Sequence, residues 1–205
     1  ILNSLISMQY CKLYNNALSD NKCNNIIEKY LKQESSYLTI LRNDYYFKNT
    51  YELRIPKNDE WKNINNDIID IISKYGFIYY KDICNFVKQY TYKEDEIYFQ
   101  DYGFNIQVIK KNIGYINWHT YNIESRYNAA GEKTQCDFAA VIFLNTVEKG
   151  GEITFKDISF KPVQGSILLY PTIWSNPIKI STPLEEDLYY IEIYMHFNSY
   201  ISKIT

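Results

Sequence analysis

The chain has 205 residues, a hydrophobic content of 46% and a formal net charge of −2 at pH 7. This length fits one large or two small domains, and the hydrophobic content is typical of a globular protein with a buried core. Lysines and arginines are scattered, which argues against a nucleic-acid partner, because such binding depends on basic patches. No apolar run reaches the roughly 18 residues that span a bilayer, so no membrane partner is predicted.

Tyrosine is unusually abundant, with 22 residues. Asparagine, isoleucine and lysine are also frequent, and all four have AT-rich codons, which indicates the genome of a virus, a phage or an AT-rich microbe. The opening residues lack the basic and apolar regions of a signal peptide, so we expect an intracellular or virion-associated protein. The four cysteines form no CxxC pair, so we expect reduced, buried thiols rather than a zinc site or a disulfide framework.

Helices are predicted in the first half of the chain. In order, the pattern indicates a strand over 9–14, a helix over 22–34, a strand over 37–41, a loop or short strand over 45–53 and a helix over 59–74. Ser19 or Asp20 is a good N-cap for the first helix. Gly76 is expected to end the second helix. Residues 77–92 fit an extended segment followed by a short helix.

Strands dominate after about residue 94. They are predicted over 96–99, 104–110, 115–120, 137–145, 152–155, 158–161, 166–170, 177–180 and 188–197. Helices first and strands afterwards indicate an α+β protein, and this many short strands suit a sandwich or jelly-roll barrel. We therefore expect one domain over 1–205, with a helical or mixed part over about 1–93 and a β-sandwich core over about 94–197.

Three motifs in the second half carry the functional argument. Residues 114–121 form a short strand-like stretch in which His119 lies five residues after Gly114. Residues 143–155 contain Phe-Leu-Asn and then Gly-Gly-Glu-Ile-Thr-Phe, whose double glycine suggests a tight turn with positive φ. Residues 162–171 contain a proline, a glycine, a leucine and a proline on a third strand.

The order of these motifs resembles the prolyl 4-hydroxylase-like family of iron- and 2-oxoglutarate-dependent dioxygenases, over about residues 10–197. Residues 16–27 are similar to the family's opening strand, turn and helix, and Pro183, Leu184 and Tyr190 are similar to the end of its site. The resemblance implies an α+β fold with a double-stranded β-helix (jelly-roll) core and N-terminal helices packed on one sheet. It also implies Fe(II) and 2-oxoglutarate as cofactors.

The residues that the resemblance assigns to the chemistry are mostly replaced. Such an iron site uses two histidines and one carboxylate. His119 matches the first ligand, but the carboxylate position holds Tyr121 and the second histidine falls on Ile178 or Lys179. The basic residue that would bind 2-oxoglutarate falls on Tyr189. We therefore interpret His119, Tyr121 and Lys179 as vestigial metal-site positions, with His119 as the remaining candidate ligand, and Tyr189 as a vestigial 2-oxoglutarate position.

Other acidic residues and a second histidine are alternatives for rescuing such a site. Glu124 could swing inward if the chain bends after Tyr121, and a cluster of Tyr115, Tyr121, Tyr170 and Tyr189 could instead fill the pocket. Asp137 and Glu152 are more simply surface or turn residues. Glu192 and His196 are expected to point away from the site, because they alternate with Tyr189 along one strand.

Three functions remain open at this stage. The first is a non-catalytic descendant of the oxygenase fold that acts as a binding or structural module, including a viral particle component, with protein partners and no cofactor. The second is an active hydroxylase with a rearranged metal site that uses Fe(II) and 2-oxoglutarate. The third is a carbohydrate-binding sandwich, for which Trp174 is the best exposed contact, whereas Trp61 and Trp118 are expected in the core.

Overall fold

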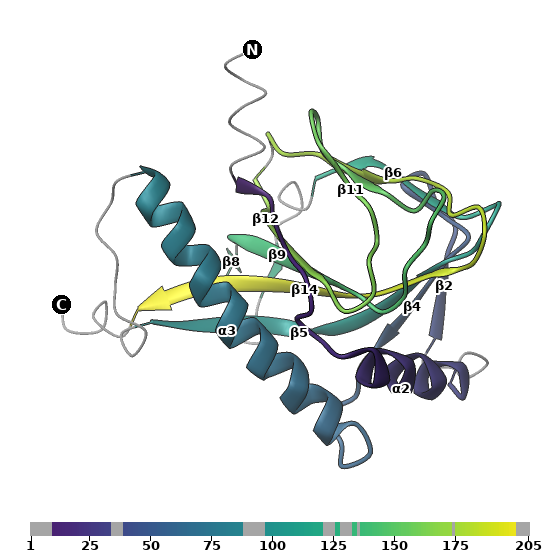
Figure 1. Ribbon diagram of the computed structural model, residues 1–205, viewed down its shortest axis with the longest axis horizontal. Coiled ribbons are helices and arrows are strands. Elements are labelled where there is room, and N and C mark those ends of the chain that lie inside the picture. Colours follow the sequence, from purple (N-terminus) through teal and green to yellow (C-terminus); the bar gives the residue numbers. More distant parts are fainter. Residues whose placement is uncertain are drawn as a thin grey trace.

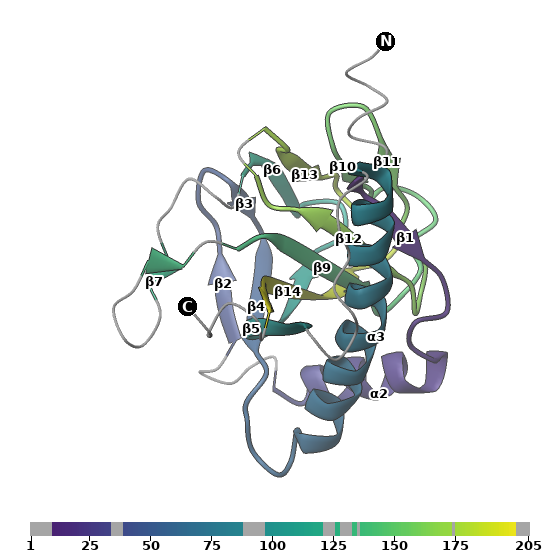
Figure 2. The ribbon, with the colours of Figure 1, turned by 90° about the vertical axis from the view of Figure 1, so that its left-hand side faces the viewer.

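The computed structural model describes residues 10–33, 39–87, 97–120, 126–127, 133–134, 136–173 and 175–199. In this part of the chain, two helices lie against one face of a core made of two packed sheets (Figures 1 and 2). Every strand pair is antiparallel. The predicted α+β jelly-roll core with helices packed on one sheet is thereby confirmed.

The larger sheet has seven strands in the order β1-β12-β9-β14-β5-β4-β2. Their bounds are β1 Lys12–Tyr14, β12 Ile167–Pro171, β9 Phe138–Phe143, β14 Leu188–Ser199, β5 Ile97–Ile109, β4 Thr50–Arg54 and β2 Thr39–Arg42. Three strands from the N-terminal part thus extend a sheet whose centre comes from the C-terminal half. The two long central strands, β5 and β14, pair along their whole lengths.

The smaller sheet has five strands in the order β11-β10-β13-β6-β3. Their bounds are β11 Ser159–Phe160, β10 Ile153–Thr154, β13 Ile178–Ile180, β6 Tyr115–His119 and β3 Phe47–Lys48. A separate pair, β7 (Arg126–Tyr127) with β8 (Lys133–Thr134), was not predicted from the sequence. The ambiguous segment 45–53 therefore contributes one strand to each main sheet, and this brings it to the edge of the space between them.

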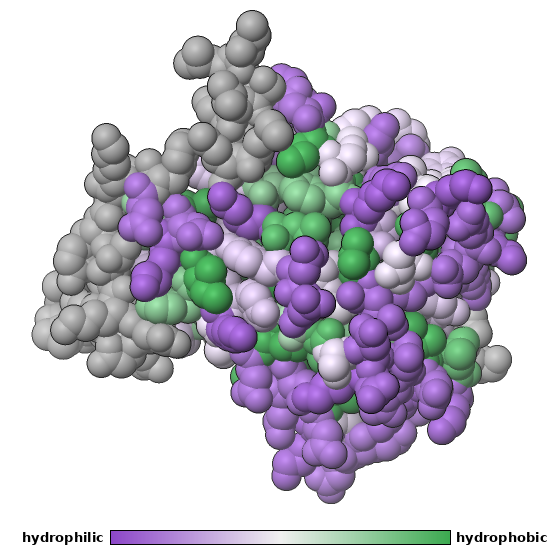
Figure 3. Space-filling model, in the orientation of Figure 1, coloured by the Kyte–Doolittle hydropathy of each residue, from purple (hydrophilic) through white to green (hydrophobic). Residues whose placement is uncertain are grey.

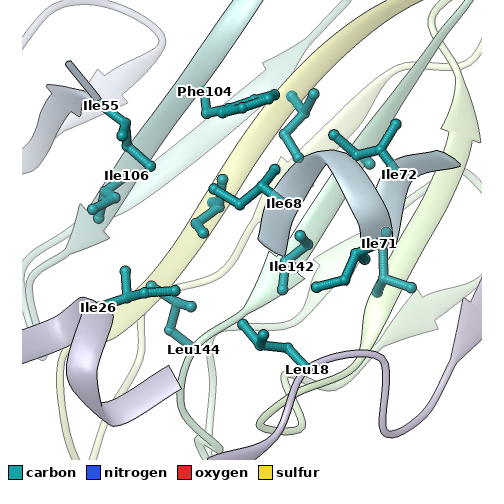
Figure 4. Packing of buried hydrophobic residues seen from close by; sticks show 14 of the residues in the cluster. Leu18, Ile26, Ile55, Ile68, Ile71, Ile72, Phe104, Ile106, Ile142 and Leu144 are labelled. Carbon is teal, nitrogen blue, oxygen red and sulfur yellow. The ribbon is translucent and has the colours of Figure 1, made fainter. Parts of the chain in front are cut away.

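The helices cover the outer face of the larger sheet. Helix α2 (Asp20–Leu31) and helix α3 (Lys62–Val87) direct their apolar stripes onto this sheet. Figure 4 shows Ile26, Ile68 and Ile71 facing strand residues that include Ile106 and Ile142. Apolar burial of this kind is what holds an amphipathic helix to a sheet. The outward side of the helices is mostly hydrophilic (Figure 3).

A second core fills the space between the two sheets. It is formed by the inward residues of both sheets, among them Phe47, Ile109, Ile116, Phe143, Phe155, Leu168, Tyr170, Ile178, Leu188, Tyr190 and Tyr194. All four cysteines belong to the described residues, where they are buried and form no disulfide, as predicted. Consecutive strand residues alternate between the two cores, so the parity of a strand residue decides whether its side chain faces the helices or the jelly-roll interior.

Most predicted elements differ from the structure by a few residues at their ends, as α2 does, and two differ more substantially. Helix α3 does not end at Gly76 but continues to Val87. Its buried stripe continues through Tyr79 and Cys84, and this packing outweighs the low helix propensity of one glycine. A Cβ atom at Gly76 would lie 3.1 Å from the Phe99 ring, so glycine allows the helix to approach β5 closely. The second difference is that the two predicted strands 96–99 and 104–110 form one continuous strand, β5.

The double glycine forms the predicted turn. Gly150 and Gly151 have φ values of 77° and 73°. A Cβ atom on Gly150 would lie 2.0 Å from the carbonyl oxygen of Thr182, so no other residue fits there without a shift of the backbone. Among the described residues, neither helix combines the length and the apolar character that crossing a membrane requires.

Candidate functional site

His119 lies at the end of β6 and faces the jelly-roll interior. On the neighbouring strand, Ile178 pairs with His119 and Ile180 pairs with Ile116, so two steps along β13 match three along β6. This β-bulge lets both Ile116 and His119 face inward although they are an odd number of residues apart. The His119 ring packs 5.5 Å from the ring of Phe47, a member of the inner core.

The surroundings of His119 favour the neutral imidazole. Burial lowers the pKa of His119, and the positive charge of Arg42 lowers it further, whereas a hydrogen bond to the Asn117 backbone opposes the shift. The distance from Nδ1 to the Asn117 carbonyl oxygen is 2.8 Å. A carbonyl oxygen can only accept, so this contact favours a proton on Nδ1, and a hydrogen bond to the Ile178 backbone also opposes the lowering of the pKa. His119 is thus prepared to offer one nitrogen to an electrophile.

The inward residue opposite His119 is Ile178, not Lys179. Ile178 is buried in the inner core, directly across from His119. Lys179 lies on the other face of β13, where its Nζ is 4.9 Å from the centre of the Trp118 ring. Of the two positions considered for the second histidine, Ile178 therefore faces His119 and Lys179 does not. Trp118 was expected in the core, but it is 44% exposed on the outer surface because the bulge turns it outward.

The prediction for the faces of β14 is also wrong. Tyr189 packs on the helix side, with its ring 5.9 Å from that of Tyr30 in α2. Tyr190 and Tyr194 belong to the inner core, so Glu192 between them faces inward rather than away from the site. Side chains alternate along a strand, so an error of one residue in an alignment exchanges the two faces. Consequently Tyr189 does not occupy the inner position of a 2-oxoglutarate-binding residue.

A row of polar residues crosses the inner face of the larger sheet. Tyr190, Gln107 and Glu52 are aligned on β14, β5 and β4, and Glu192 lies next to Tyr190 on the same face. We call Glu52, Gln107, Tyr190 and Glu192 the polar row. The Gln107 Nε2 donates to Glu52 Oε2 at 2.9 Å and to Glu192 Oε2 at 3.4 Å. One amide therefore joins two carboxylates inside the jelly roll.

Arg42 connects the polar row to His119. Its Nη1 lies 3.4 Å from Glu52 Oε2, and its guanidinium carbon lies 3.4 Å from the centre of the Phe47 ring. Phe47 thus contacts both the guanidinium and the imidazole, and the positive charge of Arg42 lowers the pKa of His119. The loop before β3 is held to β6 by Asn117, whose side chain donates to the Tyr45 carbonyl at 3.0 Å.

The sequence analysis did not single out Arg42, Glu52 or Gln107. The only available signal was the alternation of polar and apolar residues in 104–110, which ordinarily indicates a strand with one face in solvent. In this chain the polar side faces the smaller sheet. Arg42 and Glu52 come from segments whose structure was left open, so nothing in the sequence placed them near His119.

The remaining predicted residues are separated from this site or lie outside the described residues. Tyr121, Glu124 and Trp174 fall in the latter group. His196 is six residues beyond Tyr190 on β14, and its Nδ1 lies 3.0 Å from Asp137 Oδ2. Glu152 accepts a hydrogen bond from the Ser181 hydroxyl at 2.5 Å, which lowers the pKa of its carboxyl.

Iron requires a cluster of ligating side chains, and 2-oxoglutarate requires a cation for its carboxylates. Among the described residues, no group of three or more His, Cys, Asp or Glu side chains is arranged to hold a metal ion. A hydrocarbon side chain, Ile178, lies opposite His119. Two glutamates, Glu52 and Glu192, flank Gln107 on the inner face of the larger sheet, whereas a dianion is bound by cationic groups. The described residues do not fit these cofactors.

No family model matches the sequence, and no curated protein matches it. Solved structures do match. The viral collagen prolyl hydroxylase of Paramecium bursaria Chlorella virus-1, in its 2-oxoglutarate complex, is 18% identical with a TM-score of 0.59, and the match covers 91% of this chain and 95% of that chain.

Two further prolyl hydroxylases match over similar lengths. The Pseudomonas putida prolyl-4-hydroxylase is 8% identical with a TM-score of 0.61, and the match covers 96% of each chain. The Trichoplax adhaerens prolyl hydroxylase, solved with a hypoxia-inducible-factor peptide, is 13% identical with a TM-score of 0.63, covering 95% of this chain and 86% of that chain. At these identities the likeness establishes the fold, and the resemblance read from the sequence motifs is confirmed at that level.

Proposed function

We propose that this chain, which has the fold of the prolyl hydroxylases and of 2-oxoglutarate-dependent Fe(II) oxygenases, is a non-catalytic binding module. One observation carries the proposal: Ile178 takes the inward position paired with His119, where the fold would need a second metal ligand. A single imidazole binds Fe(II) only weakly, because water occupies each coordination position that has lost its protein ligand. A protein that keeps this fold without its ligands keeps a rigid, two-sheet scaffold.

The charge of the inner face supports the same conclusion. Glu52 and Glu192 are joined through Gln107 on the sheet that lines the interior. A dicarboxylate such as 2-oxoglutarate would be repelled by both groups. Arg42, whose guanidinium lies beside Glu52, is paired with this carboxylate and stacks on Phe47. The site therefore disfavours the co-substrate as well as the metal.

The partner of such a module is proposed to be a protein. The composition, which indicates an AT-rich genome, agrees with a viral origin, and a jelly-roll core is a common building block of viral particles. This supports a structural or assembly role, but only by analogy of fold. An assembly role predicts self-association, or co-purification with one defined protein, in the organism that encodes the chain.

Turnover and binding measurements test the proposal. We expect no succinate from 2-oxoglutarate in the presence of Fe(II) and ascorbate beyond that formed by free iron. Calorimetric titration should detect neither tight Mn(II) binding, with Mn(II) replacing Fe(II), nor 2-oxoglutarate binding. His119→Ala is the matched control, because it removes the candidate ligand. Iron-dependent succinate formation that disappears in His119→Ala would overturn the proposal.

That same outcome would establish the alternative, an active hydroxylase with a rearranged metal site. The observation in its favour is the orientation of His119, which faces inward with a lowered pKa and a contact that favours a proton on Nδ1. This is the state that a metal-binding imidazole requires. In that case further ligands must come from residues outside the described part of the chain, of which Tyr121 and Glu124 are the nearest in sequence.

A further inference from the structure

The polar row contains buried hydrogen-bonding atoms that have no partner in the part of the chain that the structure describes. Gln107 is 1% exposed, and its Oε1 has no hydrogen-bond partner. The hydroxyl of Tyr190 is fully buried and also has none. A third such atom is the Oδ1 of Asn105 on the same face of the sheet. Asn105 is the residue of β5 that is in register with Glu192 of β14. Buried polar groups in native proteins are nearly always satisfied, so these three need an explanation.

The orientation of the Gln107 amide shows which kind of hydrogen-bonding group a ligand would have to supply. Its nitrogen donates to both carboxylates, so the oxygen must face the opposite way. An amide oxygen can only accept, and the same holds for ionised carboxylates. Burial raises the pKa of Tyr190 well above its ordinary value, and the charge of Glu192 adds to this, so the phenol stays protonated and its oxygen retains lone pairs that can accept. The row thus presents acceptors and calls for a ligand rich in N–H donors.

We propose that the polar row binds an organic cation with several N–H donors, namely the alkylammonium group of a lysine side chain on a partner protein. This proposal rests on the proposed non-catalytic function, because iron and 2-oxoglutarate would otherwise occupy the same space between the two sheets. An ammonium offers three donors on a narrow stem, and it is attracted by carboxylates and by aromatic rings. The adjacent Phe47 ring already carries one cation, Arg42, at 3.4 Å.

The row becomes accessible at the edge of the sheet. Tyr190 and Gln107 are buried, but Glu52 and Arg42 have side chains that are 23% and 34% exposed. The strand order places β4 and β2 at this edge. Two exposed tyrosines, Tyr45 and Tyr46, pack edge to face beside it with ring centres 5.0 Å apart. Glu52, with Arg42 beside it, is therefore the part of the row that a lysine side chain of a partner would meet first.

A binding experiment with one charged and one neutral probe tests this proposal. The probes are a short peptide, acetyl-Gly-Lys-Gly-amide, and the same peptide with an acetylated lysine, titrated while the side-chain amide signals of glutamine are followed by NMR. We expect only the charged peptide to bind. The variant Glu192→Gln should weaken its binding about tenfold, the effect of losing one charge-assisted hydrogen bond. Glu186→Gln, which changes an exposed carboxylate outside the row, should leave the affinity unchanged.

Tyr190→Phe separates a binding role from a structural one. It removes a hydroxyl that has no partner in the structure, so the melting temperature should stay the same or rise while the affinity for the lysine peptide falls. Equal binding of both peptides, binding insensitive to Glu192→Gln, or binding of Ca²⁺ but of neither peptide would each overturn the proposal. Failure of the non-catalytic function has a different signature, iron-dependent succinate formation, so the two results are distinguishable.

Discussion

At the scale of single residues, His119 shows how burial sets the protonation state of a side chain. The imidazole packs against Phe47 with the Arg42 guanidinium on that ring, and both features disfavour the imidazolium. The hydrogen bond from Nδ1 to the strand's own backbone favours one tautomer. These properties follow from the location of the residue, so they persist whether or not a metal binds.

The lowered pKa of His119 predicts a loss of stability in acid. The unfolded chain binds this proton near the ordinary pKa of 6.5, whereas the folded protein binds it only at lower pH. The contribution of His119 to the stability of the folded protein is therefore fully present above about pH 6.5. It is lost as the pH falls towards the lower pKa that His119 has in the folded protein. In thermal melting experiments, His119→Gln should reduce the decrease in melting temperature that the parent protein shows as the pH falls. The control variant His196→Gln should show the same decrease as the parent protein. An identical pH profile for His119→Gln and the parent protein would contradict this.

At the scale of elements, the bulge in β6 and the alternation of β14 decide which residues face the interior. The bulge brings His119 inward and leaves Trp118 outside. On β14 the inward residues include Tyr190 and Glu192, and Tyr189 faces the helices. Neither arrangement depends on residue type. Both depend on how one strand pairs with its neighbour, which is why the aligned motif positions were a poor guide to side-chain direction.

The pairing of β6 with β13 predicts how a metal site could be restored. Ile178→His places an imidazole opposite His119, and Tyr121→Asp supplies the carboxylate that the His-x-Asp pattern expects. Without metal the double variant should be less stable than the parent by about 2 to 5 kcal/mol, because the buried apolar side chain of Ile178 is lost and an imidazole is buried in its place.

Metal should reverse this loss by mass action. The measurement is the melting temperature with and without Co(II), together with the Co(II) absorption spectrum. Tyr121→Asp alone is the control and should show little response. If the double variant does not respond to Co(II), the inward position of Ile178 relative to His119 has been misassigned.

At the scale of the whole molecule, the larger sheet is shared by two cores. Its outer face carries α2 and α3, and its inner face packs on the smaller sheet. The helix layer is held by apolar burial and has no part in the polar row. Its contribution is therefore to stability and to the shape of the sheet.

Substitutions in α3 test the contribution of this layer. Ile68 is fully buried against the sheet, so Ile68→Ala should lower the free energy of unfolding by about 2 to 5 kcal/mol. The neighbouring Ile69 is 47% exposed, so Ile69→Ala should change the free energy of unfolding by less than about 0.5 kcal/mol. Urea denaturation of the two variants and the parent protein checks this. Equal effects would mean that α3 is not packed on the sheet through Ile68.

Much of the fold was predictable because its signals are local. The helix over 22–34, the strands of the second half and the double-glycine turn rest on periodicity and on the conformational freedom of glycine. The end of α3 was missed because tertiary packing carries a helix through Gly76. The polar row was missed because it combines side chains from β4, β5 and β14, and no local pattern relates these strands.

The sequence by itself determined that the chain forms a jelly roll with helices on one side, that His119 lies on a strand of it and that the usual ligands are replaced. The first two conclusions follow from spacing and alternation along the chain, and the third follows from the resemblance of its motifs to the prolyl 4-hydroxylase-like family. Only the tertiary structure decided that Ile178 faces His119, that Glu192 faces inward and that Arg42 approaches from an edge strand. The physical reason is that strand register and a bulge set side-chain direction, and both arise from pairing between segments far apart in sequence.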